Sequence, residues 1–126
     1  MNLIFGVSGL RGIVGEGLSP EIISKYVLSF AKEIPLGTVV IGNDSRASAD
    51  MVKDAVVSSL KSLGFDILDI GIAPTPTVQF ITKMKNASGG ISITASHNPE
   101  KWNGLKFIES NGIFFNEKKI DSIKKI

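Results

Sequence analysis

Apolar side chains recur along the chain at two spacings, and each spacing predicts a different kind of element. In residues 19–34 and 48–63 they lie three and four positions apart, which places them on one face of a helix. Ser19 followed by Pro20 and Glu21 is a typical helix start, because serine caps free N–H groups and proline fits the first turn. The pattern therefore predicts an amphipathic helix over each range.

Short apolar runs rich in β-branched residues separate these helices and predict buried strands. The runs cover residues 38–41, 65–70 and 90–94. A shorter helix is expected over residues 77–84, after a Pro-Thr-Pro break, and a last helix is expected from Asn116. Strands and helices therefore alternate, which is typical of a sheet enclosed between helices.

An Asn-Gly dipeptide at residues 111–112 interrupts this alternation. It lies between the apolar runs 104–108 and 113–115, and Asn-Gly favours the tight turn of a β-hairpin. We therefore expect an α/β fold with a mainly parallel, mixed sheet sandwiched between helices and an antiparallel hairpin near one edge. A chain of 126 residues is long enough for one domain with its own core.

Composition excludes several classes of protein. The formal net charge of +2 is too small for the basic surface that is typical of nucleic-acid binding. The absence of cysteine excludes disulfides, a thiolate nucleophile and a Cys-ligated metal, and it fits a reducing compartment. Because the sequence has neither a secretory signal nor a membrane-spanning run, we expect a cytoplasmic protein without a nucleic-acid or membrane partner.

Common catalytic signatures are also absent from the sequence. It contains no phosphate-binding P-loop, no dinucleotide fingerprint after a strand and no G-x-S-x-G hydrolase elbow. The only histidine, His97, is adjacent to Ser96 and so is poorly placed to act as its triad base. Asp44 and Asp50 match no metal-binding pattern, so this chain alone is not expected to complete a metal site.

Two polar loops follow expected strands. Residues 43–46, Asn-Asp-Ser-Arg, follow the first strand, and residues 94–99, Thr-Ala-Ser-His-Asn-Pro, follow the third. Ligands of α/β sheets gather at the carboxyl ends of strands, because loops and helix N-termini converge there. Residues 94–99 have two interpretations: a turn capped by side-chain hydrogen bonds, or a reactive Ser96 hydroxyl with His97 and Lys106 supplying positive charge.

A third segment, residues 6–12, combines three glycines with Arg11. Glycines allow close approach of the backbone to a ligand, and a guanidinium is well shaped for a phosphate. The segment is therefore either an anion-binding loop or a flexible lead-in to the first helix.

Three segments together resemble the first domain of the α-D-phosphohexomutases, the phosphoglucomutase/phosphomannomutase superfamily. They are FGVSGLRG, IGNDSRAS and ITASHNPEKWNGLKF, in the order and at the separations of that family. The resemblance covers essentially the whole chain, and T-A-S-H-N-P followed by N-G-x-K is highly specific. Val7 departs from the pattern, since the family usually has threonine there, and one hydrogen bond of the first loop is lost with that hydroxyl.

The resemblance implies that Ser96 is phosphorylated in the resting enzyme. Its phosphoryl group passes to a hexose 1-phosphate, and the serine then takes the other phosphate from the bisphosphate intermediate to leave the 6-phosphate. A phosphoserine carries about −1.5 to −2 charges near neutral pH, so nearby cations are required. Arg11, His97 and Lys106 are implied to supply them, with Arg11 and Lys106 as candidates for general acid and base.

The same resemblance implies supporting residues, cofactors and partners. The supporting residues are Ser8, Asp44, Arg46, Asn98 and Asn103, of which Asp44 and Arg46 brace the site and Ser8 holds the Arg11 segment. Mg²⁺ is implied to bind through the phosphate of Ser96 and through a second domain, with hexose 1,6-bisphosphate as intermediate and activator. Residues 1–126 are then domain I of a four-domain chain, so the implied partners are the remaining domains and a phosphosugar. The isolated chain is expected to have little or no mutase activity.

The sequence leaves more than one expectation for the sugar substrate. T-A-S-H-N-P resembles glucose and mannose enzymes more than amino-sugar mutases, which commonly have S-A-S-H-N-P, so a phosphoglucomutase/phosphomannomutase is expected and a phosphoglucosamine mutase is the alternative. A non-catalytic module that binds a phosphosugar or another anion is an alternative from a different class. It requires an unmodified Ser96 and binding that Ser96→Ala does not change.

Overall fold

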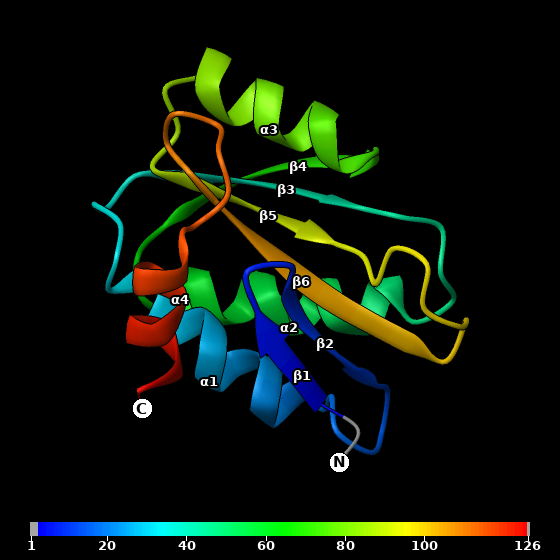
Figure 1. Cartoon of the computed structure of the whole chain (residues 1–126). Coiled ribbons are helices and arrows are strands. Elements are labelled where there is room, and N and C mark those ends of the chain that lie inside the picture. The colour runs from blue at the N-terminus through cyan, green and yellow to red at the C-terminus, as the bar shows by residue number, and fades with distance from the viewer. Residues whose placement is uncertain (1–2, 126) are drawn as a thin grey trace.

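The computed structural model describes residues 3–125 and shows one sheet with helices on both faces (Figure 1). Six strands are hydrogen-bonded in the order β1-β2-β6-β5-β3-β4. Their bounds are Leu3–Gly6 (β1), Gly9–Ile13 (β2), Thr38–Asn43 (β3), Asp66–Ile72 (β4), Gly89–Ile93 (β5) and Trp102–Glu109 (β6). The helices are Pro20–Ala31 (α1), Ala49–Ser62 (α2), Thr75–Met84 (α3) and Glu117–Lys124 (α4). The expected α/β fold with a mixed sheet between helices is therefore confirmed.

The helices α1 and α4 each begin at a residue whose side chain caps one of the first N–H groups. Ser19 Oγ accepts a hydrogen bond from the N–H of Ile22 at 3.2 Å, at the start of α1. Asn116 caps α4 in the same way, through the N–H of Lys119 at 2.9 Å. Each cap supplies an acceptor for a donor that has no partner inside the helix. These local contacts explain why both helix starts could be predicted.

Side chains of the strands alternate between the two helical layers. Val39 and Ile41 of β3 are buried in the large core against α1 and α2, whereas Val40 packs against Val78 of α3 on the opposite face. This alternation follows from the pleat of a strand. In Figure 1, α1, α2 and α4 lie below the sheet and α3 lies above it. Because both faces of β3 are covered, its sequence is continuously apolar.

Gly90 allows α3 to lie close to the sheet. A Cβ at this position would be 2.4 Å from Thr82 Oγ1, and that hydroxyl is held by a 2.7 Å hydrogen bond to the Val78 carbonyl. We expect Gly90→Ala to lower the free energy of unfolding by about 1–3 kcal/mol, because the added methyl group overpacks this contact. Urea unfolding measures the change. Gly6→Ala is the matched control, since a Cβ on Gly6 meets nothing within 4 Å, and equal losses in the two variants would contradict the prediction.

Residues 3–13 form a β-hairpin at one edge of the sheet, which differs from the expected glycine-rich loop. β1 and β2 pair antiparallel and are joined through Val7 and Ser8. Gly9 has a φ of +103°, and a Cβ there would lie 2.3 Å from the Leu105 carbonyl oxygen of β6. Glycine is uncommon in strands, so the sequence favours a loop. Close approach to β6 is the tertiary reason for a glycine at position 9.

The pairing of the strands also differs from a mainly parallel sheet. Among residues 3–125, β3 pairs in parallel with β4 and β5, whereas β1 with β2, β2 with β6, and β5 with β6 are antiparallel. The turn at residues 111–112 is not near a sheet edge either, because β6 lies between β2 and β5. β2 pairs only with residues 102–105 of β6, and beyond that stretch the returning segment forms an antiparallel bridge between Ile108 and Phe114.

Candidate active site

Two loops meet at the carboxyl ends of β3 and β5. The two strands are parallel neighbours, so residues 44–48 and residues 94–101 leave the sheet side by side. The N–H of Asp44 donates to the Ile93 carbonyl at 3.0 Å and joins the loops where they begin. The structure therefore brings together the two polar loops that the sequence singles out.

Ser96 is exposed and has a φ of +53°, in the left-handed region that non-glycine residues rarely adopt. Its N–H donates to Thr94 Oγ1 at 3.0 Å, and its carbonyl accepts from Arg46 Nη2 at 2.9 Å. The Ser96 hydroxyl makes no hydrogen bond with any residue in the range 3–125. Its backbone is therefore held on both sides while its hydroxyl is free, and strain of this kind is typical of functional sites.

The guanidinium of Arg46 binds the Ser96 loop through carbonyl groups. Nη1 donates to the carbonyls of Pro99 at 2.6 Å and Trp102 at 3.0 Å. Nη2 donates to those of Ser96 at 2.9 Å and Asn98 at 2.8 Å. Nε donates to Asp44 Oδ2 at 3.1 Å. A guanidinium has five N–H donors, so every one of them is engaged.

Two further hydrogen bonds tie the same loops together. Asn103 is fully buried, and its Nδ2 donates to Ser48 Oγ at 2.9 Å while its Oδ1 accepts from the N–H of Gly104 at 2.8 Å. The Ala47 N–H donates to Glu100 Oε2 at 3.1 Å. Asp44, Arg46 and Asn103 therefore hold the two loops together.

The side chain of Arg11 has donors to spare. Arg11 lies on β2, opposite Gly104 of β6, and not in a loop. Nη1 donates to Asn98 Oδ1 at 3.0 Å, whereas Nε is buried and has no partner. A Cβ on Gly104 would be 2.2 Å from the Leu10 carbonyl oxygen and 2.9 Å from Arg11 Cγ, so this glycine lets the backbone of β2 lie close to β6. Arg11 is therefore suited to bind an anion beside Asn98.

Lys106 and His97 are not within hydrogen-bonding distance of Ser96 in this structure. Lys106 shares a sheet face with Arg11, because the strand partner of Arg11 lies two residues before it on β6. Its ammonium lies 5.9 Å from the centre of the Phe114 ring. His97 is exposed and makes no side-chain contact of this kind with residues 3–125. Neither side chain therefore contacts the Ser96 hydroxyl in this structure.

Ser8 does not hold Arg11 as the sequence predicts. It lies exposed in the turn between β1 and β2, and its hydroxyl has no hydrogen-bond partner within residues 3–125. Pairing of β2 with β6 positions Arg11 instead.

Sequence reasoning also gave no role to Thr94 or Glu100, which hold the Ser96 loop. A Thr two residues before Ser96 is a signal for a side-chain-capped turn, whereas Glu100 has no such signal.

The described residues do not fit a metal ion by themselves. Within residues 3–125, no group of three or more His, Asp or Glu side chains lies close enough to hold one. The carboxylate of Asp44, which lies on one of the two loops, already accepts hydrogen bonds from Arg46 through both of its oxygens. No step of the chemistry is therefore assigned to a metal held by this chain alone.

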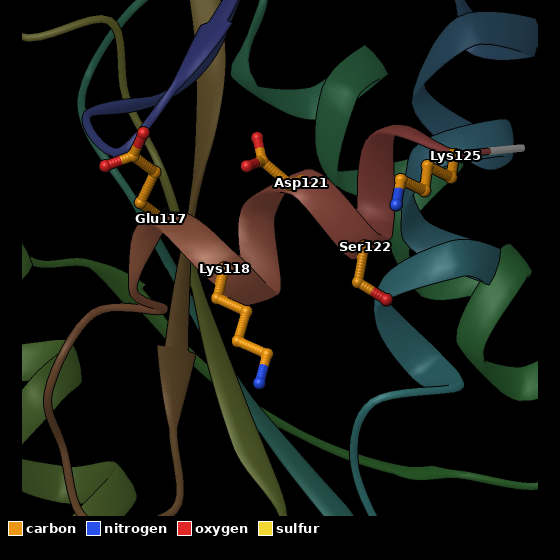
Figure 2. Close-up of a pocket in the computed structure, with 5 residues that line it drawn as sticks. All are labelled: Glu117, Lys118, Asp121, Ser122 and Lys125. Carbon is orange, nitrogen blue, oxygen red and sulfur yellow. The ribbon is translucent and has the colours of Figure 1, made fainter.

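Two hollows on the surface differ in their position relative to the Ser96 loop. One of about 350 Å³ adjoins the Arg46 loop and reaches the end of β4 at Gly71 and Ile72. Another, of about 620 Å³, lies along α4 and is lined by the five residues of Figure 2: Glu117, Lys118, Asp121, Ser122 and Lys125. In that view the lining side chains point in different directions. Since α4 follows the far end of β6, this second hollow is separate from Ser96.

Comparison with known proteins identifies the class to which this fold and site belong. The family described as phosphoglucomutase/phosphomannomutase, alpha/beta/alpha domain I, matches residues 2–126. A phosphoglucomutase/phosphomannomutase of Thermococcus kodakarensis is 47% identical over 120 residues, covering 90% of this chain and 26% of that protein. A phosphoglucosamine mutase of Nautilia profundicola is 40% identical over 124 residues, covering 97% and 28%. A phosphoglucomutase/phosphomannomutase family protein of Burkholderia thailandensis superposes with a TM-score of 0.83 at 26% identity, covering 97% of this chain and 29% of that one.

The sheet order, the two loops and these matches place the chain among the α-D-phosphohexomutases. Within that superfamily it belongs to the phosphoglucomutase/phosphomannomutase family, and it matches that family's α/β/α domain I. The chain spans 26% and 28% of the lengths of the two sequence relatives. Relatives with both names match it, so membership of the family does not select the sugar. Within residues 3–125, no helix combines the length and the apolar character needed to cross a membrane.

Proposed function

We propose that residues 1–126 are domain I of a hexose phosphomutase and that Ser96 carries the phosphoryl group. The observation that carries the proposal is the exposed Ser96 hydroxyl on a left-handed backbone that Thr94 and Arg46 hold on both sides. A fixed, unpartnered hydroxyl at the end of a parallel strand suits a group that must meet a substrate in one orientation. Arg11, with N–H donors free, supports binding of the phosphate.

The reaction consists of two phosphoryl transfers. In the first, the sugar 6-hydroxyl oxygen bonds to phosphorus as the bond from phosphorus to Ser96 Oγ breaks, and the hydroxyl proton passes to a base. In the second, Ser96 Oγ bonds to the phosphorus of the 1-phosphate as that phosphorus leaves the sugar oxygen, which takes up a proton. Catalysis of such transfers depends mainly on position and charge neutralisation. Arg11 and His97 supply charge at the phosphate, and Arg11 and Lys106 are the proposed general acid and base once a substrate is bound.

The proposed substrates are hexose 1-phosphates and 6-phosphates, of glucose or mannose in the first place. Phosphoglucosamine is the alternative, because relatives of both names match the chain. Hexose 1,6-bisphosphate is the proposed intermediate and activator. We propose that Mg²⁺ binds through the phosphate on Ser96 and through ligands outside residues 1–126, and that remaining domains of a longer chain complete the site.

The test uses a chimera in which this chain replaces the matching segment of the 47% identical relative. It is incubated with hexose 1,6-bisphosphate and then with glucose, mannose or glucosamine 1-phosphate. We expect peptide mass spectrometry to find one phosphoryl group on Ser96, and coupled assays to show conversion of at least one sugar phosphate. A folded chimera with an unmodified Ser96 and no conversion of any of the three sugars would refute the proposed function.

One observation favours a second candidate, a non-catalytic module that binds an anion. Neither His97 nor Lys106 contacts the Ser96 hydroxyl, so no base is in place in the structure without substrate. Calorimetric titration with hexose 6-phosphate separates the two functions. The module requires equal affinity in the unmodified protein and in Ser96→Ala, with no phosphoryl group on Ser96 at any stage.

A further inference from the structure

We propose that Arg46 is a positioning residue for the phosphoryl-carrying serine, and that it acts on the backbone of the Ser96 loop and not on phosphate. This inference deepens the proposed function and rests on it. In this proposal, Arg46 holds Ser96 in its left-handed conformation and thereby sets the direction of the His97 N–H. Arg11 and Arg46 then have different tasks, although both are arginines of polar segments close to the same serine.

Saturation of the Arg46 guanidinium is the first reason. Its five N–H groups bind four loop carbonyls and the Asp44 carboxylate, and its side chain is only 10% exposed. A phosphate could bind there only after one of these bonds had broken. The Asp44 carboxylate also balances the charge of Arg46 locally. Arg11, by contrast, keeps a buried Nε without a partner.

The direction of the peptide groups is the second reason. In a trans peptide the carbonyl and the following N–H point in opposite directions, and no peptide among residues 3–125 is cis. Because the Ser96 carbonyl points at Arg46, the N–H of His97 points away from it. That N–H has no partner within residues 3–125. It is thus a donor available to a phosphate oxygen on Ser96, aimed by a hydrogen bond on the other side of the same peptide.

Distance along the sequence is the third reason. The carbonyls that Arg46 binds belong to residues 96, 98, 99 and 102, and these lie 50 to 56 positions away. One planar group therefore fixes both ends and the middle of the loop. Lysine keeps the charge but has a single nitrogen with three donors, so it cannot reach all four carbonyls. Replacement of Arg46 by lysine consequently separates geometry from charge.

The experiment compares Arg46→Lys and Arg46→Ala with Lys53→Ala in the chimera described above. Lys53 lies on helix α2 and forms one ion pair, with Asp69 of β4. It is a suitable control because its replacement removes that ion pair and no contact with the Ser96 loop. Rapid-quench mass spectrometry gives the rate of Ser96 phosphorylation by hexose 1,6-bisphosphate. The ¹⁵N–¹H NMR signal of the His97 amide, assigned by its displacement in His97→Gln, reports the conformation of the Ser96 loop. The phosphorylation rate and the NMR signal are both measured at a temperature well below the thermal unfolding midpoint of each variant.

We expect Arg46→Lys and Arg46→Ala to slow phosphorylation about 100-fold, because misplacing a reacting group by roughly 1 Å has that effect. The KM for the bisphosphate should change far less than the rate, the His97 amide signal should shift, and Lys53→Ala should match the wild-type chimera. Added guanidinium ion should restore part of the rate of Arg46→Ala, and ammonium ion should not.

Three results would overturn the proposal: phosphorylation at the wild-type rate in Arg46→Lys, equal slowing in Lys53→Ala, or an unchanged His97 amide in both Arg46 variants. Failure of the proposed function is distinct from these. If the wild-type chimera takes up no phosphoryl group on Ser96, the catalytic assignment is lost. The NMR comparison then still decides whether Arg46 holds the loop.

Discussion

Replacing Ser96 by glycine should abolish phosphoryl transfer and leave a protein more stable than the alanine variant. Both variants lack the hydroxyl, so in the chimera we expect turnover to fall by more than about 10⁴-fold in each, as for loss of other catalytic nucleophiles. Their stabilities should differ because position 96 has a φ of +53°. Glycine adopts this region freely, whereas alanine there costs roughly 1–2 kcal/mol.

Urea unfolding and the coupled mutase assay together check this result. We expect Ser96→Gly to exceed Ser96→Ala by about 1 kcal/mol in free energy of unfolding. Ser58, which is exposed on α2 and bonds only its own helix, provides a control position for both substitutions, where glycine should be the less stable residue. Full turnover by either Ser96 variant would exclude this serine as the phosphoryl carrier.

Replacing Arg11 by methionine should have the second largest effect, on activity and not on stability. Methionine keeps much of the side-chain volume but removes all five donors, so phosphate on Ser96 or on substrate loses its guanidinium. Loss of a charged group that stabilises a transition state costs about 10²–10³-fold in turnover. The same change removes the hydrogen bond to Asn98 and also a buried Nε that has no partner; these two effects oppose each other, so the free energy of unfolding should change by less than about 1 kcal/mol.

Steady-state kinetics of the chimera and urea unfolding test the Arg11 prediction, with Lys61→Met as the control. Lys61 is exposed on α2, so its loss should change neither quantity. A large loss of stability in Arg11→Met would show instead that this arginine mainly holds β2 against β6. Activity equal to that of Lys61→Met would remove Arg11 from the phosphate site.

Much of the fold was predictable because its signals are local. Ser19 and Asn116 cap the helices that follow them, and the apolar runs of β3 and β5 are buried as their composition indicates. The first helix ends at Ala31, three residues earlier than its apolar spacing predicts. There the N–H of Lys32 and the N–H of Glu33 bond three residues back, so the last turn tightens before the proline.

The features that the sequence mispredicted depend on contacts between segments that are far apart in the chain. The glycines of residues 6–12 indicate a loop, but they lie in and beside strands because β2 packs against the backbone of β6. Ser8 was expected to hold Arg11, and strand pairing does so instead. The Asn-Gly turn was predicted from its own residues, whereas its place away from a sheet edge depends on which strands flank β6.

The amino-acid sequence alone identified the family, and it singled out Ser96 as the proposed phosphoryl carrier, because a specific run of residues follows a buried strand. The resemblance implies different roles for the two arginines, Arg11 as a cation at the phosphate and Arg46 as a brace, but it does not give their hydrogen-bond partners. Only the folded chain decides that Arg46 is fully engaged and that Arg11 has donors to spare. The physical reason is that the role of a guanidinium depends on which acceptors its N–H groups bind. For Arg46 most of these acceptors belong to a loop about fifty residues further along the chain.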